Sequence, residues 1–324
     1  RQSLNQGTGK CHCGCPVDVD ASSAKKAWTR WLRLFRMKYP GTEYMAIPDQ
    51  RERVWFGERI DRILNRPNLT DNQKHRILWQ VIEAEEFEQF LHTRYFGQKR
   101  FSVEGCEALL PLIDALVETG SALGASEMVI GMAHRGRLNV LAHILHKPYE
   151  VILSEFEGNM HNEEGEDEGD VKYHQGYSCD FETKQGQKMH LSLSPNPSHL
   201  ELVNPVIEGM VQAKQDYLND TARERVIPLQ IHGEAAFCGQ GIVAETLNLS
   251  QLDGYHNGGS IHIIINNQLG YTATPEETRF TTYPTEGAAS IQAPVMHVNA
   301  DDPEAVVHVA KMAMAYRNKF KKDV

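Results

Sequence analysis

The stretch that decides the fold extends from Ile231 to Asn267 and has the sequence IHGEAAFCGQGIVAETLNLSQLDGYHNGGSIHIIINN. It contains the end of one apolar run, 226–231, and the whole of a second, 261–265. Both runs have the length and the β-branched residues of buried parallel strands. The segment Gly241–Ser250 between them is typical of a crossover helix that follows a glycine turn. The stretch therefore predicts a strand–helix–strand unit of a parallel sheet.

A polar side chain follows each of these two strands, Glu234 after the first and Asn267 after the second. Open α/β sheets bind their ligands at the carboxyl edge of the strands. A carboxylate oxygen, an amide oxygen and a backbone carbonyl at that edge suit an octahedral Mg²⁺ that also binds phosphate oxygens. The spacing therefore predicts a site for Mg²⁺ and a phosphate group.

The same stretch resembles the thiamine diphosphate fingerprint, which begins Gly-Asp-Gly and ends Asn-Asn after the crossover helix. The second half agrees, with Asn266 and Asn267 after the apolar run. The first half departs from the fingerprint, because Glu234 stands where the family has aspartate and Ala235 follows it. Glutamate is one methylene longer, so the ion or the turn at Gly233 must shift to accommodate it.

Further motifs flank this stretch on both sides. They are Lys99–Gly105 (KRFSVEG), Gly131–Leu141 (GMAHRGRLNVL), Gly169–His174 (GDVKYH), Asn196–Glu201 (NPSHLE) and His297–Val306 (HVNADDPEAV). In this order they are similar to the motifs of the dehydrogenase component of the 2-oxoglutarate dehydrogenase complex. The resemblance extends from Trp55 to Val324, and the 2-oxoadipate dehydrogenases are included among the relatives.

The resemblance implies an α/β fold with a doubly wound, mainly parallel sheet, the thiamine diphosphate-binding fold, preceded by a helical region. We expect a flexible leader at 1–23, an all-helical region at 24–100 and the diphosphate-binding domain at 101–324. In the family a pyrimidine-binding domain follows and supplies the glutamate that helps to generate the reactive cofactor. The 324-residue chain by itself is therefore expected to be inactive.

Periodicity and capping signals predict the individual elements. The expected helices are Lys25–Tyr39, Arg53–Leu64, Asp71–Phe96, Val103–Gly120, Leu138–Leu145, Leu200–Leu218 and Pro303–Lys321, and the further expected strands are Glu127–Met132, His190–Ser194 and Pro294–Asn299.

The resemblance also assigns roles to single residues. It implies that Mg²⁺ is bound by Glu234, Asn267 and the carbonyl of Leu269. The implied substrate ligands are His134, His174 and Ser198. The residues implied to bind thiamine diphosphate are Arg135, Ser198, Leu200, Glu234, Ala235, Ala236 and Asn267. His134 and His174 are the implied catalytic residues, since imidazole donates to carboxylates and exchanges protons near neutral pH. His199 and His232 lie close to the same strand ends and are weaker candidates.

The function implied is the oxidative decarboxylation of 2-oxoglutarate in the tricarboxylic acid cycle. The succinyl group then passes to the lipoyl group of a dihydrolipoyl succinyltransferase component, and the dehydrogenase is a homodimer. One alternative is a 2-oxoadipate dehydrogenase component, whose substrate is one methylene longer. Another is a non-catalytic scaffold-type relative, which the departure at Glu234 favours.

Bulk properties exclude other classes. A formal charge of −10 argues against a nucleic-acid-binding protein, and no apolar run is long enough for a membrane span. Six cysteines without a regular framework suggest reduced thiols, as in the bacterial cytoplasm or the mitochondrial matrix.

Two local features remain. The Cys11–Cys15 motif is expected to be part of an exposed terminus and not a zinc site, because no second ligand pair follows. The acidic run Asn162–Asp170 is expected to be a solvated loop that acts as a hinge for His174.

Overall fold

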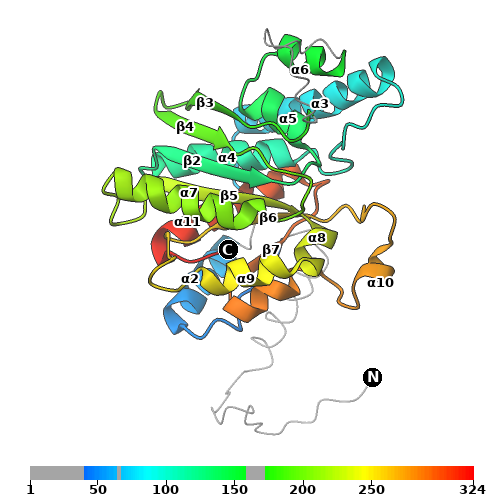
Figure 1. The fold of residues 1–324 in the computed structure, drawn as a ribbon. Coiled ribbons are helices and arrows are strands. Elements are labelled where there is room, and N and C mark those ends of the chain that lie inside the picture. The colour runs from blue at the N-terminus through cyan, green and yellow to red at the C-terminus, as the bar shows by residue number, and fades with distance from the viewer. Residues whose placement is uncertain (1–39, 64–66, 158–171) are drawn as a thin grey trace, which may run out of the picture. The chain divides into compact units, whose positions relative to one another are not determined.

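A five-stranded sheet runs through the protein, and its strands lie in the order β3–β4–β2–β5–β6 (Figure 1). Their bounds are β2 (Glu127–Met132), β3 (Tyr177–Glu182), β4 (Lys188–Leu193), β5 (Val226–Gly233) and β6 (Ile261–Ile265). All neighbours are parallel except β3, which pairs antiparallel with β4 at one edge. The mainly parallel sheet predicted from the sequence is confirmed.

The computed structural model describes residues 40–63, 67–157 and 172–324. The leader, the Cys11–Cys15 motif, the expected helix Lys25–Tyr39 and the acidic run Asn162–Asp170 lie outside these ranges, and so does the hinge expected there.

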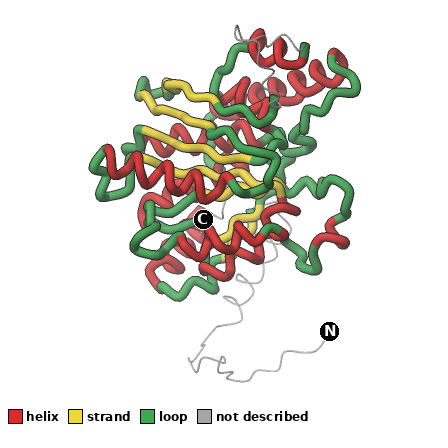
Figure 2. The backbone as a smooth tube through the Cα atoms, in the orientation of Figure 1, coloured by secondary structure: helices red, strands yellow, loops and turns green. Residues whose placement is uncertain are grey.

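Helices cover both faces of the sheet (Figure 2). Along β2, Met128, Ile130 and Met132 share a core with α3 (Asp71–Arg94), α4 (Leu109–Ala122) and α11 (Pro303–Phe320). Val129 lies on the opposite face and packs against α7 (Val203–Tyr217). Because successive side chains of a strand alternate between faces, apolar residues on both sides bury β2 completely. The doubly wound arrangement is therefore confirmed.

Gly131 allows α7 to lie close to β2. A Cβ atom built at this position would be 2.5 Å from a side-chain carbon of Ile207. The glycine at the start of the GMAHRG motif is thus required by helix–sheet packing directly below the strand end that carries the candidate site.

The remaining elements are short or peripheral. They are β1 (Gly41–Glu43), α2 (Gln50–Ile63), α5 (Arg137–Asn139), the π-helical turn η1 (Val140–Ile144), α6 (Tyr149–Phe156), α8 (Glu234–Gly239), α9 (Gly241–Leu249), α10 (Pro275–Thr278), the 3₁₀ helix η2 (Pro284–Ile291) and β7 (Val295–His297). The crossover helix predicted at Gly241–Ser250 is α9, whose Val243 and Leu247 pack against Ile264 of β6.

Several predicted boundaries were wrong. The helix expected from Val103 begins at Leu109, because the backbone has positive φ at Glu104 and Gly105, and the helix expected from Leu200 begins at Val203, after a positive φ at Glu201. The helix expected at Leu138–Leu145 is instead α5 followed by the π-helical turn η1. β3 was not predicted.

Strand β7 was expected in the main sheet but pairs antiparallel with β1 in a separate two-stranded sheet. The region 24–100 is therefore not all-helical, since β1 belongs to it. Helix α3 contributes Ile77, Ala84, Phe87 and Leu91 to the same core as the strands. Residues 40–324 form one compact unit, and the proposed division at residue 100 stays a prediction.

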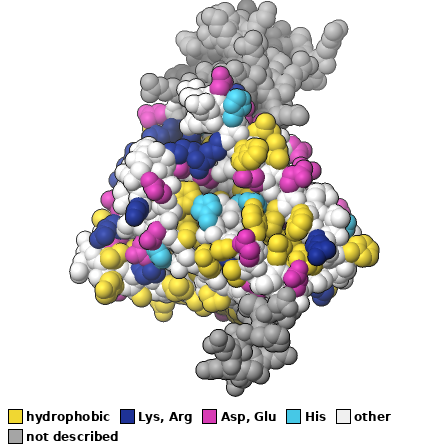
Figure 3. All heavy atoms as spheres, turned by 90° about the horizontal axis from the view of Figure 1, so that it is seen from above, with side chains coloured by type: hydrophobic (Ala, Val, Ile, Leu, Met, Phe, Trp, Pro, Cys, Tyr) yellow, Lys and Arg dark blue, Asp and Glu magenta, His cyan; other side chains and the backbone are white. Residues whose placement is uncertain are grey.

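The last features of the fold are the apolarity of its helices and the distribution of charge on its surface. No helix in the described part of the chain has the length and apolarity to cross a membrane. Acidic, basic and hydrophobic side chains share the face seen from above, so neither sign of charge dominates there (Figure 3).

Candidate active site

The candidate site lies at the carboxyl ends of β2 and β5, which are neighbours in the sheet. After β2 the chain continues on the face covered by α4, where Leu138 and Leu141 join the main core. After β5 it continues to α9 on the opposite face. Adjacent strands whose connections leave toward opposite faces open a crevice between them, and this is where open α/β sheets bind ligands.

Two histidines and a serine meet at this edge. The rings of His134 and His174 have centroids 4.7 Å apart, and Ser198 Oγ lies 3.1 Å from His174 Nε2. Phe101 and Tyr173 pack around His134, with centroid distances of 5.5 and 5.4 Å. Three motifs that are far apart in sequence are therefore in direct contact, as the substrate-site prediction requires.

His134 is a neutral imidazole near neutral pH. Its pKa is lowered to about 4, mainly by burial and also by the neighbouring charges of His174 and Arg137. Its buried Nε2 has no hydrogen-bond partner among the described residues. A polar atom left unpaired in a buried position is costly unless a ligand binds it, so His134 has a free position for a substrate oxygen.

Arg137 holds this group of residues together, and the sequence reasoning missed it. Its guanidinium is fully buried and donates to the carbonyls of Met132 at 3.2 Å, Gln175 at 2.8 Å and Ser194 at 2.5 Å. These carbonyls belong to the end of β2, the segment after the undescribed residues and the end of β4. The sequence shows a second arginine in the AHRGR motif but not which carbonyls it binds, since two of them lie 38 and 57 residues away in the chain.

Arg135 lies beside the same edge. Its Nη1 donates to the Ser102 carbonyl at 2.8 Å. Its charge also acts on Cys106, whose pKa is raised to about 11, mainly by burial and also by Glu107, Glu234 and Asp301, while Arg135 opposes the rise.

The two predicted metal ligands follow neighbouring strands whose ends are in register, with Gly233 opposite Ile265. Glu234 opens α8 and is only 3% exposed. In the described part of the chain no residue donates a hydrogen bond to its carboxylate. A carboxylate that no protein donor holds at this edge is the kind of oxygen ligand that a divalent cation prefers.

The side chain of Asn267 is oriented by backbone carbonyls. Its Nδ2 donates to Val103 at 3.0 Å and Glu104 at 3.3 Å. Carbonyls only accept, so the amide nitrogen must face them and Oδ1 must point away. The contact of Oδ1 with the Leu269 amide is long, at 3.4 Å. Oδ1 therefore keeps a lone pair for a metal ion.

The other predicted cofactor residues lie at the same edge. Ala235 and Ala236 form the first turn of α8 and are partly exposed, while Leu200 and Leu269 are 43% and 45% exposed. A hollow of about 400 Å³ opens beside Asn267, lined in part by Glu104, Asn266 and Asp301. The described residues contain no cluster of three histidine, cysteine or acidic side chains suited to a metal.

The two weaker histidine candidates differ in their exposure and hydrogen bonding. His199 is exposed. His232 is buried with both ring nitrogens engaged, Nδ1 at 2.6 Å from Glu201 and Nε2 at 3.0 Å from His262. His232 therefore stabilises the junction of β5 with the Asn196–Glu201 motif and has no nitrogen left for a substrate.

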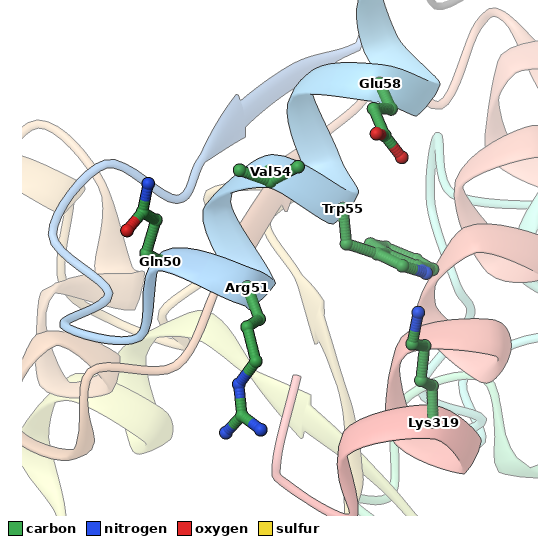
Figure 4. Close-up of a pocket in the computed structure, with 6 residues that line it drawn as sticks. All are labelled: Gln50, Arg51, Val54, Trp55, Glu58 and Lys319. Carbon is green, nitrogen blue, oxygen red and sulfur yellow. The ribbon is translucent and has the colours of Figure 1, made fainter.

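A second hollow, of about 330 Å³, lies between α2 and α11 (Figure 4). Its lining side chains are Gln50, Arg51, Val54, Trp55, Glu58 and Lys319. It contains none of the predicted site residues, and Trp55 packs there against Phe56, Tyr316 and Phe320. This hollow belongs to the contact of the two helices.

Comparison with known proteins identifies the family. A family model described as "Dehydrogenase E1 component" matches residues 81–324. The 2-oxoglutarate dehydrogenase E1 component of Cupriavidus necator is 48% identical over 297 residues, covering 90% of this chain and 31% of that protein. The multifunctional 2-oxoglutarate metabolism enzyme of Mycolicibacterium vanbaalenii is 50% identical, covering 90% and 24%. The 2-oxoglutarate dehydrogenase E1/E2 component of Corynebacterium glutamicum is 50% identical, covering 88% and 23%. The chain thus spans between about a quarter and a third of the relatives it matches.

Proposed function

Since the chain belongs to the dehydrogenase E1 component family, we propose that it is the part of a 2-oxoglutarate dehydrogenase that binds the diphosphate of thiamine diphosphate and the 2-oxo acid. The observation that carries this proposal is that two groups of candidate residues lie at the same edge of the sheet. His134, His174 and Ser198 are in contact on one side, and Glu234 and Asn267 follow neighbouring strands on the other. The names of the similar proteins support 2-oxoglutarate as the substrate.

The donor set fits Mg²⁺ and the diphosphate of the cofactor. Glu234, the Oδ1 of Asn267 and the carbonyl of Leu269 would bind the ion, whose preferred ligands are oxygens. Arg135 and Ser198 would donate to diphosphate oxygens, and Leu200, Ala235 and Ala236 would line the cofactor. When bound, thiamine diphosphate supplies the carbanion for attack on the keto carbon and accepts the electron pair released with carbon dioxide.

The protein's own residues bind and orient the acid. The unpaired Nε2 of His134 donates to a substrate carboxylate when that nitrogen carries the proton of the neutral ring. An anion bound there would raise the pKa of His134 from its low value. His174, held by Ser198 at 3.1 Å, orients the other end of the diacid.

The whole enzyme would then pass the succinyl group to the lipoyl group of a dihydrolipoyl succinyltransferase. We propose a homodimer that acts in the tricarboxylic acid cycle, in the bacterial cytoplasm or the mitochondrial matrix. One relative is named as an E1/E2 component, which supports an acyltransferase partner. A 2-oxoadipate dehydrogenase is the second candidate, because Glu234 and the histidines suit either diacid.

The test is the rate of carbon dioxide release by the complete enzyme that contains this chain, with 2-oxoglutarate and 2-oxoadipate compared. One methylene in a fitted pocket is worth about 1–3 kcal/mol, or 10–200-fold. We expect 2-oxoglutarate to be preferred by about tenfold or more. Preference for 2-oxoadipate would favour the second candidate, and no release from either acid would favour a scaffold.

A further inference from the structure

The segment Phe101–Gly105 connects the two groups of candidate residues, although no predicted site residue belongs to it. The Phe101 carbonyl accepts from Gly136 N at 2.9 Å, and the Ser102 carbonyl accepts from Arg135 at 2.8 Å. The Val103 carbonyl accepts from Asn267 Nδ2 at 3.0 Å. One short stretch of backbone therefore contacts both the loop after β2 and the loop after β6.

This segment does not belong to a helix or strand, and its backbone is unusual. Phe101 and Glu104 have φ values of 46° and 38°, a left-handed region that residues other than glycine rarely adopt. Such a conformation persists only where surrounding contacts enforce it. The segment therefore needs an anchor in the scaffold.

Glu88 of α3 is that anchor. Its carboxylate accepts from Val103 N, at 2.9 Å to Oε1 and 3.2 Å to Oε2. Oε1 also accepts from Asn139 Nδ2 at 2.7 Å. Asn139 is buried at the end of α5 and belongs to the same motif, Gly131–Leu141, as His134 and Arg135. Glu88 thus fixes the amide of the same residue whose carbonyl orients Asn267.

We propose that Glu88 is a positioning residue of the metal site, which acts by holding Val103 so that its carbonyl keeps the Asn267 amide turned with Oδ1 toward Mg²⁺. This inference rests on the proposed function, because it takes Asn267 as a metal ligand. Without Glu88, the Val103 amide loses its acceptor and the carbonyls of Val103 and Glu104 lose their fixed position. Asn267 can then rotate, and the ion loses an oriented ligand.

The charge state of Glu88 supports a pH-dependent effect. Its pKa is raised to about 7, mainly by burial and also by Glu107 and Glu104, and the hydrogen bonds from Val103 and Asn139 oppose the rise. The ionised carboxylate is the stronger acceptor. Below about pH 7 the group is protonated, the hold on Val103 weakens, and the affinity for Mg²⁺ should fall.

The experiment is calorimetric titration of Mg²⁺ into the complete enzyme with thiamine diphosphate present, at about pH 6, 7 and 8. Removing an outer-shell partner of a metal site typically costs 10–100-fold in affinity, so Glu88→Ala should bind Mg²⁺ at least about tenfold more weakly at pH 8. Glu88→Gln is neutral at every pH and keeps one acceptor oxygen, as the protonated acid does. It should therefore bind Mg²⁺ at pH 8 about as weakly as the wild type does at pH 6, and its affinity should not change between pH 8 and 6. Glu86→Ala, an exposed acid on the same helix, is the matched control and should change nothing.

The outcomes separate the two claims. If the wild type binds the cofactor without Mg²⁺, the proposed function fails. If the wild type requires Mg²⁺ but Glu88→Ala binds it with wild-type affinity, the role of Glu88 is overturned. Should Glu88→Ala fail to fold, the pH profile of Glu88→Gln decides, and a retained loss of affinity between pH 8 and 6 would overturn the proposal.

Discussion

The site has a substrate half (His134, His174 and Ser198) and a metal half (Glu234, Asn267 and Leu269). The two halves differ in how firmly protein hydrogen bonds hold their side chains. In the substrate half, Arg137 donates to carbonyls of three chain segments, and His174 is bonded to Ser198. In the metal half, the buried carboxylate of Glu234 has no donor among the described residues, and the Oδ1 of Asn267 has only a 3.4 Å contact. The residues of the substrate half are therefore held in place by protein contacts, with the Nε2 of His134 left for a substrate, whereas the carboxylate of Glu234 in the metal half is not held by a protein donor.

This difference has a physical reason. Directional recognition of a small acid requires donors whose positions do not change on binding. A divalent cation supplies its own strong field and organises oxygen ligands around it. A fully buried arginine, Arg137, holds the substrate half in place, whereas Mg²⁺ and diphosphate would organise the metal half.

The largest effect is expected from the histidines of the substrate half. His134→Ala and His174→Ala should each lower turnover of a 2-oxo diacid by about 10²–10⁴-fold, the usual contribution of a positioned proton donor. Cofactor affinity should stay near the wild-type value. His143→Ala is the control, since burial also lowers the pKa of His143 to about 4 but its ring packs against Phe87, away from the site. Near-normal turnover in both site variants would show that these histidines are structural.

Arg137 should dominate the stability of the substrate half. Arg137→Met leaves several buried carbonyls without a donor and should lower the free energy of unfolding by about 3 kcal/mol or more. Arg279→Met is the comparison, because Nε and Nη1 of Arg279 are buried without a partner in the described part of the chain. Its loss should change stability by less than about 1 kcal/mol. Equal decreases in the free energy of unfolding of the two variants, measured by urea-induced unfolding, would contradict this prediction.

The metal half should depend on Asn267. Asn267→Ala removes a ligand oxygen that no neighbour replaces and should weaken Mg²⁺-dependent binding of thiamine diphosphate by about 100-fold or more. Asn266→Ala, at the exposed position just before it, should have little effect. An unchanged calorimetric affinity in Asn267→Ala would remove Asn267 from the metal site.

The smallest expected effect concerns acid stability. The pKa of His134 is about 4 in the folded protein and near 6.5 in the unfolded chain, so the unfolded state binds more protons between these values. Stability should be full above about pH 6.5 and fall toward pH 4, with His134 contributing up to about 1.4 kcal/mol per pH unit. His134→Asn should show a shallower fall in urea-induced unfolding measured at about pH 7, 6 and 5. Parallel profiles would mean that His134 ionises freely.

The sequence predicted what is encoded locally. The apolar runs of β5 and β6 lie where expected, and the contact of His134, His174 and Ser198 agrees with their predicted shared role. Helix starts were missed where Glu104 and Glu201 adopt positive φ, because neither residue type signals a left-handed backbone.

Features that depend on distant pairing could not be predicted. The pattern of β7 suits any sheet, and only tertiary structure decides that its partner is β1. The partners of Arg137 lie up to 57 residues away in the chain, and the contact of Glu88 with Val103 spans 15 residues and joins α3 to a segment partly predicted as helix. Motifs therefore indicate which residues contact a ligand, but not which other residues hold those side chains in position.

The central claim is that the substrate half is formed before the cofactor binds and the metal half is completed by it. Amide hydrogen exchange of the complete enzyme, with and without thiamine diphosphate and Mg²⁺, tests this directly. We predict that protection rises at 234–236 and 266–270 on binding, while the amides at 132–137 and 193–194 are already protected and change little. Equal gains in both halves, or a gain confined to the substrate half, would contradict the account.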